Sequence, residues 1–195
     1  MKILIDNGHG AETAGKRSPD GSLREYKYAR EIAERIVTCL KEKGFDAERI
    51  VTEENDVSLT ERCRRVNSVC DRLEAKNVIL VSVHCNAAGN GSQWMNARGW
   101  SAHVSMNAST QSKAFARSLI EAAEKEGLKI RKYAHQVPYW SQNLAICRDT
   151  KCPAVLTENL FQDNKEDVAF LLSEAGKDTI VSLHVKGIAN YLKTI

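Results

Sequence analysis

The sequence lacks several features that would assign it to a particular class of protein. No apolar run approaches the ~20 residues that a membrane-spanning helix needs. The first ten residues, MKILIDNGHG, hold an apolar run far shorter than the core of a signal peptide. We therefore expect a chain that is made in the cytoplasm without a visible signal peptide and does not contact membranes. Removal of a leader from a longer precursor stays open as an alternative.

An excess of charge of one sign is also missing. The 28 basic and 25 acidic residues give a net charge of +3 and are spread along the chain, whereas a nucleic-acid binder needs a concentrated basic face. Only three prolines occur, and no repeat or low-complexity tract marks a linker. Because 195 residues suffice for one well-buried core, we predict a single domain, 1–195, that is monomeric and does not bind nucleic acid.

The six cysteines lack the paired C-x-x-C spacing of a structural zinc site. A chain of this size does not need disulfides to stabilise its core. Reduced thiols are therefore expected. Cys147 and Cys152 flank a short polar turn and are the one pair for which a bridge is considered.

The sequence does contain an alternation of strand and helix patterns. The continuous apolar run at 78–83 is typical of a central parallel strand covered on both faces. Ser58 opens a Ser-Leu-Thr-Glu capping box, which predicts a helix to about residue 74. We predict an α/β fold with a mostly parallel twisted sheet flanked by helices on both faces. The other expected strands are 2–5, 45–52, 99–106 (at an edge) and 154–156, and the other expected helices are 23–43, 109–127, 165–173 and 174–192.

Side chains that can bind a metal follow two of these strands. His9 follows the first strand, His84 follows the strand 78–83, and Glu25 lies near the start of a helix that must pack back toward the first strand. Ligands of such sheets bind at the carboxyl ends of the strands, so two imidazoles and a carboxylate converge there as in a catalytic zinc site. Taken singly, His9 could be a turn residue, His84 a hydrogen-bonded core histidine, and Glu25 a carboxylate favoured by the helix dipole.

Other polar residues near the strand ends are weaker candidates. Glu158 follows the strand 154–156 and could instead accept hydrogen bonds from a neighbouring helix. Cys85 suggests a nucleophile, but the alternation of a strand points it away from His84. Asn86 could contact a substrate or cap the turn. His103 and His135 are alternative metal or substrate residues, and His184 is expected to be a surface or structural residue.

Five segments in order resemble the zinc-dependent N-acetylmuramoyl-L-alanine amidase family, whose domain occurs in bacterial autolysins and phage endolysins. They are DNGHG at 6–10, REYKYAREIAERI at 24–36, SLTERCRRVN at 58–67, SVHCNA at 82–87 and PAVLTENLFQDNKED at 153–167. The resemblance covers essentially the full chain. Asn7 replaces a usual proline, Cys85 replaces a small residue, and Asn159-Leu160 replaces a usual x-Gly.

The resemblance implies that one Zn²⁺ is held by His9, Glu25 and His84, with Glu158 as the catalytic base. It also implies that the substrate is peptidoglycan in the cell wall. The enzyme would hydrolyse the amide bond between N-acetylmuramic acid and the L-alanine of the stem peptide.

The resemblance also bears on how the enzyme is regulated, and two other functions stay open as alternatives. Some members of the family carry an inserted helical segment that plugs the zinc site. Here the strand 99–106 passes almost directly into the helix 109–127, so we expect an enzyme that is active without an activator. The alternatives are a zinc peptidase on the same scaffold and a non-catalytic wall-binding module.

Overall fold

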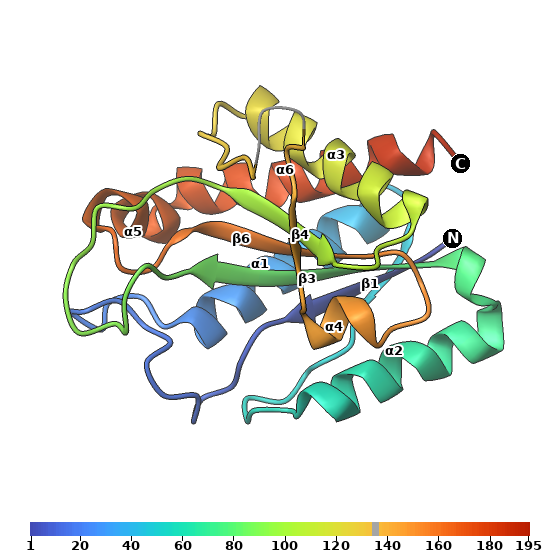
Figure 1. Ribbon diagram of the computed structural model, residues 1–195, viewed down its shortest axis with the longest axis horizontal. Helices are drawn as coiled ribbons and strands as arrows, with labels where there is room; N and C mark the ends of the chain where they lie inside the picture. Colours follow the sequence, from blue (N-terminus) through green and yellow to red (C-terminus); the bar gives the residue numbers. More distant parts are fainter. Residues whose placement is uncertain (134–136) are drawn as a thin grey trace.

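A six-stranded sheet forms the centre of the protein in the computed structural model, which describes residues 1–133 and 137–195 (Figure 1). The strand order is β2-β1-β3-β6-β4-β5. Strands β2, β1, β3 and β6 are parallel, and β4 pairs with β6 in the antiparallel sense, with β5 parallel to β4. The predicted mostly parallel sheet is confirmed. The strands are β1 Lys2–Asn7, β2 Asp46–Arg49, β3 Val78–Asn86, β4 Ser101–Ser105, β5 Trp140–Gln142 and β6 Ala154–Phe161.

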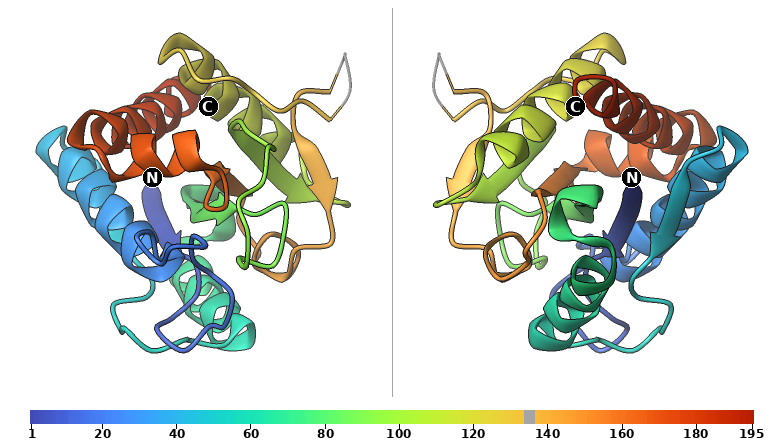
Figure 2. Two further views of the ribbon diagram at one scale, coloured as in Figure 1. Left: turned by 90° about the vertical axis from the view of Figure 1, so that its left-hand side faces the viewer. Right: turned by 90° about the vertical axis from the view of Figure 1, so that its right-hand side faces the viewer.

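Helices cover both faces of this sheet, as predicted (Figure 2). One face packs against α1, α3 and α6 in the larger apolar core, and the other packs against α2 and α4 in a smaller one. Ser58 caps α2 by accepting a hydrogen bond from the N–H of Glu61, as the capping box predicts. The helices are α1 Glu25–Glu42, α2 Leu59–Leu73, α3 Thr110–Lys125, α4 Ala145–Arg148, α5 Lys165–Leu172 and α6 Glu174–Leu192, with a 3₁₀ turn at Ala75–Asn77.

The alternation of side chains along β1 and β3 determines which face each residue reaches. Ile3 and Val81 lie in the core beneath α1 and α6, whereas Leu4 and Leu80 lie in the core beneath α2. Because side chains two positions apart share a face, His84 lies on the same face as Leu80. The candidate ligand His84 therefore lies on the α2–α4 side of the sheet.

One expectation about the sheet was wrong. The predicted edge strand 99–106 is β4, which lies between β6 and β5, so it is an inner strand. The edge strand on this side of the sheet is β5, at Trp140–Gln142. A three-residue strand is too short to show an alternating pattern, and its partner β4 lies far away in the sequence, so neither periodicity nor a hairpin signal could reveal it.

Two further expectations can be compared with the structure. Cys147 and Cys152 are both free thiols, as are the other four cysteines. Among the described residues, none of the helices is long and apolar enough to cross a membrane.

Candidate active site

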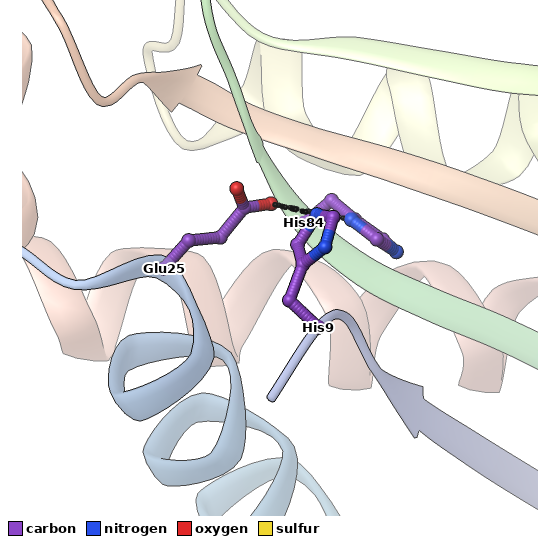
Figure 3. A group of neighbouring side chains, drawn as sticks. All are labelled: His9, Glu25 and His84. Carbon is purple, nitrogen blue, oxygen red and sulfur yellow. Dashed lines mark hydrogen bonds and ion pairs between the residues drawn. The ribbon is translucent and has the colours of Figure 1, made fainter. Parts of the chain in front are cut away.

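His9, Glu25 and His84 come together at the carboxyl ends of β1 and β3 (Figure 3). One potential ligand atom from each residue lies within 4.8 Å of the others. Glu25 Oε1 is 3.2 Å from His84 Nδ1 and 3.4 Å from His9 Nε2. The two imidazole rings are 5.0 Å apart and nearly perpendicular, at 86°. Three different segments of the chain thus bring together three side chains of types that can bind a metal.

The backbone before His9 is shaped by its contact with His84. A Cβ atom at Gly8 would lie 2.2 Å from Cε1 of the His84 ring, so no other residue fits without moving that ring. His9 itself has a positive φ of 60°, a left-handed conformation that is uncommon outside glycine. The loop after β1 is therefore bent to place the His9 ring beside that of His84.

Two arginines hold this bent loop in place. Arg62 donates from Nη2 to the carbonyl of His9 (3.0 Å) and from Nη1 to Asp6 Oδ1 and the carbonyl of Asn7 (2.6 Å each). Arg30 donates to the same His9 carbonyl (3.1 Å). Sequence reasoning assigned no role to either arginine, although Arg62 stands in the segment SLTERCRRVN that carries the family resemblance.

The surroundings of Glu25 favour its ionised form. The side chain is fully buried, and its Oε1 accepts a hydrogen bond of 2.9 Å from the N–H of Cys85. Burial alone would raise its pKa, but hydrogen bonds from His84 and His9 and their positive charge lower the pKa well below its usual value. Burial lowers the pKa of His84 and the hydrogen bond to Glu25 raises it, with a net increase.

Glu158 lies within β6, not after it as predicted, because the strand extends to Phe161. It is in register with His84 on β3 and with Ser101 on β4, so these side chains share the α2–α4 face. Its Oε2 is buried and has no hydrogen-bond partner among the described residues. Burial raises the pKa of Glu158 to about 7, which suits a group that exchanges protons at neutral pH.

Cys85 and His103 are held in ways that do not favour catalysis or metal binding. Cys85 points into the core on the opposite face from His84, and burial raises the pKa of its thiol well above the usual value. His103 lies on the same face as Glu158, but its Nε2 is 3.0 Å from Ser101 Oγ and its Nδ1 is 2.9 Å from Gln142 Oε1. Burial lowers the pKa of His103 to about 4.

The remaining candidates take local roles or lie outside the described residues. Asn86 Oδ1 accepts a hydrogen bond of 2.9 Å from the N–H of Ala87, so the side chain caps the turn. His184 is a buried structural residue whose ring nitrogens are 2.9 Å from Thr157 Oγ1 and 2.7 Å from the carbonyl of Ile180. His135 lies outside the residues that the structure describes.

The segment Asn159-Leu160, where the sequence departs from the resembled pattern, forms an irregularity in β6. Asn159 donates from Nδ2 to the carbonyl of His84 (2.9 Å) and accepts at Oδ1 from Trp100 Nε1 (2.8 Å). Leu160 has a positive φ of 63°, which is the conformation that a glycine adopts without strain. The backbone near Glu158 therefore has a conformation typical of glycine, although residue 160 is a leucine.

A cavity of about 330 Å³ opens beside the histidines on the α2–α4 face. Its lining is mainly apolar and includes Val57, Leu59, Leu144, Ile146 and Leu156, next to His9 and His84. A ligand bound there would reach the His–Glu–His cluster. A larger cavity of about 560 Å³, lined by residues such as Ile79, Ser109 and Pro153, contains none of the four candidate site residues.

The open α/β sheet carries a His–Glu–His cluster at the carboxyl ends of β1 and β3 and a half-buried glutamate beside it on β6, and such strand ends are where ligands of these sheets bind. The N-acetylmuramoyl-L-alanine amidase family matches residues 3–190. The chain belongs to this family, which confirms the resemblance found in the sequence.

Individual relatives agree with this assignment. The endolysin of Bacillus phage SPP1 is 28% identical over 192 residues, which cover 97% of this chain and 65% of the endolysin. The amidase CwlM of Bacillus licheniformis is 26% identical over 191 residues, which cover 97% of this chain and 68% of CwlM. The chain thus spans about two thirds of the length of these relatives. The catalytic domain of CwlV from Bacillus (Paenibacillus) polymyxa var. colistinus has the same fold, with a TM-score of 0.82, 24% identity and 100% of each chain covered.

Proposed function

We propose that this chain is the catalytic domain, over 1–195, of a zinc-dependent peptidoglycan amidase. It hydrolyses the amide bond between N-acetylmuramic acid and the L-alanine of the stem peptide. The observation that carries the proposal is the convergence of His9, Glu25 and His84 beside Glu158, whose pKa is raised to about 7. Membership of the amidase family supports the choice of substrate.

The three clustered side chains fit one zinc ion. Two imidazoles and one carboxylate are the donor set of many catalytic zinc sites, and three protein ligands leave a position for water or substrate. Glu25 Oε1 faces both imidazoles, at 3.2 Å from His84 Nδ1 and 3.4 Å from His9 Nε2, and Oε2 is buried without a hydrogen-bond partner among the described residues, so the carboxylate is suited to serve as a ligand. When bound, zinc supplies a Lewis acid that polarises the amide carbonyl and makes water a stronger acid.

Glu158 carries the proton transfer in the proposed reaction. It takes a proton from the attacking water and returns it to the nitrogen of the leaving L-alanine. Its partly buried position and its Oε2, which lacks a hydrogen-bond partner in the described chain, leave the carboxylate free for this exchange. The strand register keeps it beside His84, because β6 is paired on both sides at this level.

The protein acts on the cell wall as a monomer and needs no activator. Independence from an activator is inferred from the short connection between β4, which ends at Ser105, and α3, which begins at Thr110. Four intervening residues do not suffice for a helix that could cover the cluster. Addition of a suspected activator protein should leave the rate of wall digestion unchanged, and strong stimulation would contradict this part of the proposal.

Digestion of purified peptidoglycan tests the proposed activity. Mass spectrometry should detect intact stem peptides that begin with L-alanine, together with glycan strands that lack peptides. Treatment with a chelator should abolish the release, and added zinc should restore it. Cleavage inside the stem peptide would identify a peptidase instead, and binding to the wall without any cleavage would identify a wall-binding module.

A further inference from the structure

Arg131 is held in a fixed position between two aromatic rings. Its guanidinium carbon lies 5.2 Å from the centre of the Trp140 ring and 4.9 Å from that of Phe161. Its aliphatic part passes over Gly99, where a Cβ atom would lie 2.9 Å from Arg131 Cγ. Stacking of this kind restricts the side chain before any ligand binds, so little conformational entropy is lost on binding.

This guanidinium lies on the same face of the sheet as Glu158. Trp140 is in register with His103, and their rings stack at 6.0 Å with an angle of 21°. His103 contacts Ser101, which is in register with Glu158 across the antiparallel pair β4–β6. Arg131 therefore stands on the β4–β5 side of the proposed base. Its charge acts on the pKa of Glu158 by opposing the increase that burial causes.

The hydrogen-bonding groups of Arg131 are available to a ligand. Within 1–133 and 137–195, its guanidinium forms neither an ion pair nor a hydrogen bond with the protein. Neighbouring cations are paired: Lys132 with Glu124 at 3.0 Å, and Arg98 with Asp167 at 2.9 Å. The planar fork of an arginine matches a carboxylate, with which it forms two parallel charge-assisted hydrogen bonds.

We propose that Arg131 binds a carboxylate of the stem peptide close to the bond that is cleaved. This inference rests on the proposed amidase function. The lactyl carboxyl of the sugar is consumed in the scissile amide, so the nearest free carboxylate belongs to the peptide. The peptide consequently lies on the β4–β5 side of Glu158, and the enzyme prefers a stem whose second residue has a free α-carboxylate to one in which this group is a carboxamide.

The test compares two synthetic substrates, N-acetylmuramoyl-L-alanyl-D-isoglutamate and its D-isoglutamine counterpart, which differ only in that group. For the wild type, we expect kcat/KM to be about 10- to 100-fold higher for the carboxylate substrate, as is typical for hydrogen bonds to a charged group. Arg131→Met should remove the preference by lowering kcat/KM for the carboxylate substrate alone. Arg131→Lys, which keeps the charge but loses the fork, should give an intermediate ratio.

Lys132→Met provides a matched control, because it removes a neighbouring exposed cation that is already paired, and its ratio should equal that of the wild type. Thermal unfolding shows whether each variant folds. If Arg131→Met does not fold, the test uses Arg131→Lys, whose ratio of kcat/KM between the two substrates should fall below that of the wild type. Equal cleavage of both substrates by the wild type, or an equal loss on both in the Arg131 variants, would overturn the inference and assign the arginine a purely structural role. Failure of the wild type to cleave either substrate would instead contradict the proposed function.

Discussion

Two carboxylates on opposite sides of the site, the buried Glu25 and the half-buried Glu158, have pKa values that are shifted in opposite directions. Glu25, at the start of α1, is buried, which would raise its pKa, but the two imidazoles beside it lower the pKa well below its usual value. Glu158, on β6, has an oxygen without a partner in the described chain, and burial raises its pKa to about 7. Environments that separate two pKa values in this way assign different roles to the same functional group. We interpret Glu25 as the metal ligand and Glu158 as the base.

The largest effects are expected from removing one charge at a time. Glu158→Gln should lower the rate of stem-peptide release by about 10²- to 10⁴-fold, because the water loses its proton acceptor. The zinc content, measured by elemental analysis, should stay at that of the wild type. Near-normal activity in this variant would contradict the assignment of the base.

Glu25→Gln is the matched variant on the other side of the site. It should also lose activity, but through loss of the metal, because a neutral amide binds zinc more weakly than a carboxylate does. The zinc content should fall well below that of Glu158→Gln when both are purified in parallel. If both variants retain zinc equally, the contrast between the two glutamates is wrong.

Removing the arginine that holds the loop of His9 in place should have the next largest effect. Arg62 is buried and bonded to Asp6 at 2.6 Å, so Arg62→Met leaves a buried carboxylate without its cation. Loss of one partner of such a pair lowers the free energy of unfolding by about 3–5 kcal/mol. Urea unfolding should show this loss, together with weaker zinc binding as His9 moves.

Arg30→Met serves as the control for Arg62. Arg30 donates to the same His9 carbonyl, but most of its other bonds are to exposed carbonyls such as that of Glu53. We expect this variant to lose only about 1 kcal/mol, the usual net value of such hydrogen bonds. A loss as large as that of Arg62→Met would mean that the ion pair with Asp6 is not what stabilises the loop.

The raised pKa of Glu158 predicts a pH-dependent stability of the metal-free protein. Because its pKa is about 7 in the folded state against an ordinary 4.5, the folded state binds the proton more tightly. The resulting stabilisation is complete below pH 4.5 and is lost as the pH rises through 7. It amounts to about 3 kcal/mol at most, at 1.36 kcal/mol for each pKa unit.

Urea unfolding of wild type and Glu158→Gln, both with chelator at pH 4.5 to 8, measures this contribution. The amide does not titrate, so the difference between the two free energies of unfolding isolates Glu158, and other titrating groups cancel. As the pH rises, the free energy of unfolding of Glu158→Gln should increase relative to that of the wild type. Parallel curves would show that the pKa of Glu158 is not raised.

The two sides of the site also differ in how far the sequence could predict them. His9 and His84 follow apolar runs that form parallel strands, and the carboxyl ends of parallel strands meet at one edge, so their convergence could be inferred. The β4–β5 side could not be inferred in this way. Trp140 comes near His103 through a three-residue strand, and Arg131 comes near Glu158 through its stacking on Trp140 and Phe161 and its backbone hydrogen bond to Trp100. Side chains that meet through short, non-local strands leave no periodic pattern in the sequence.

The smallest expected effect concerns Leu160, whose left-handed conformation is costly for a side chain but free for glycine. Leu160→Ala and Leu160→Gly both remove the buried isobutyl group and differ from each other by one methyl group, so the difference between them reports mainly the backbone. We expect the glycine variant to be more stable than the alanine variant by about 1 kcal/mol in urea unfolding. The buried Leu171 in α5 provides the control: there the order should reverse, because alanine favours a helix over glycine by about 1 kcal/mol. The same order at both positions would show that residue 160 is not strained, and the irregularity of β6 beside Glu158 would then follow from the bonds of Asn159 to His84 and Trp100 alone.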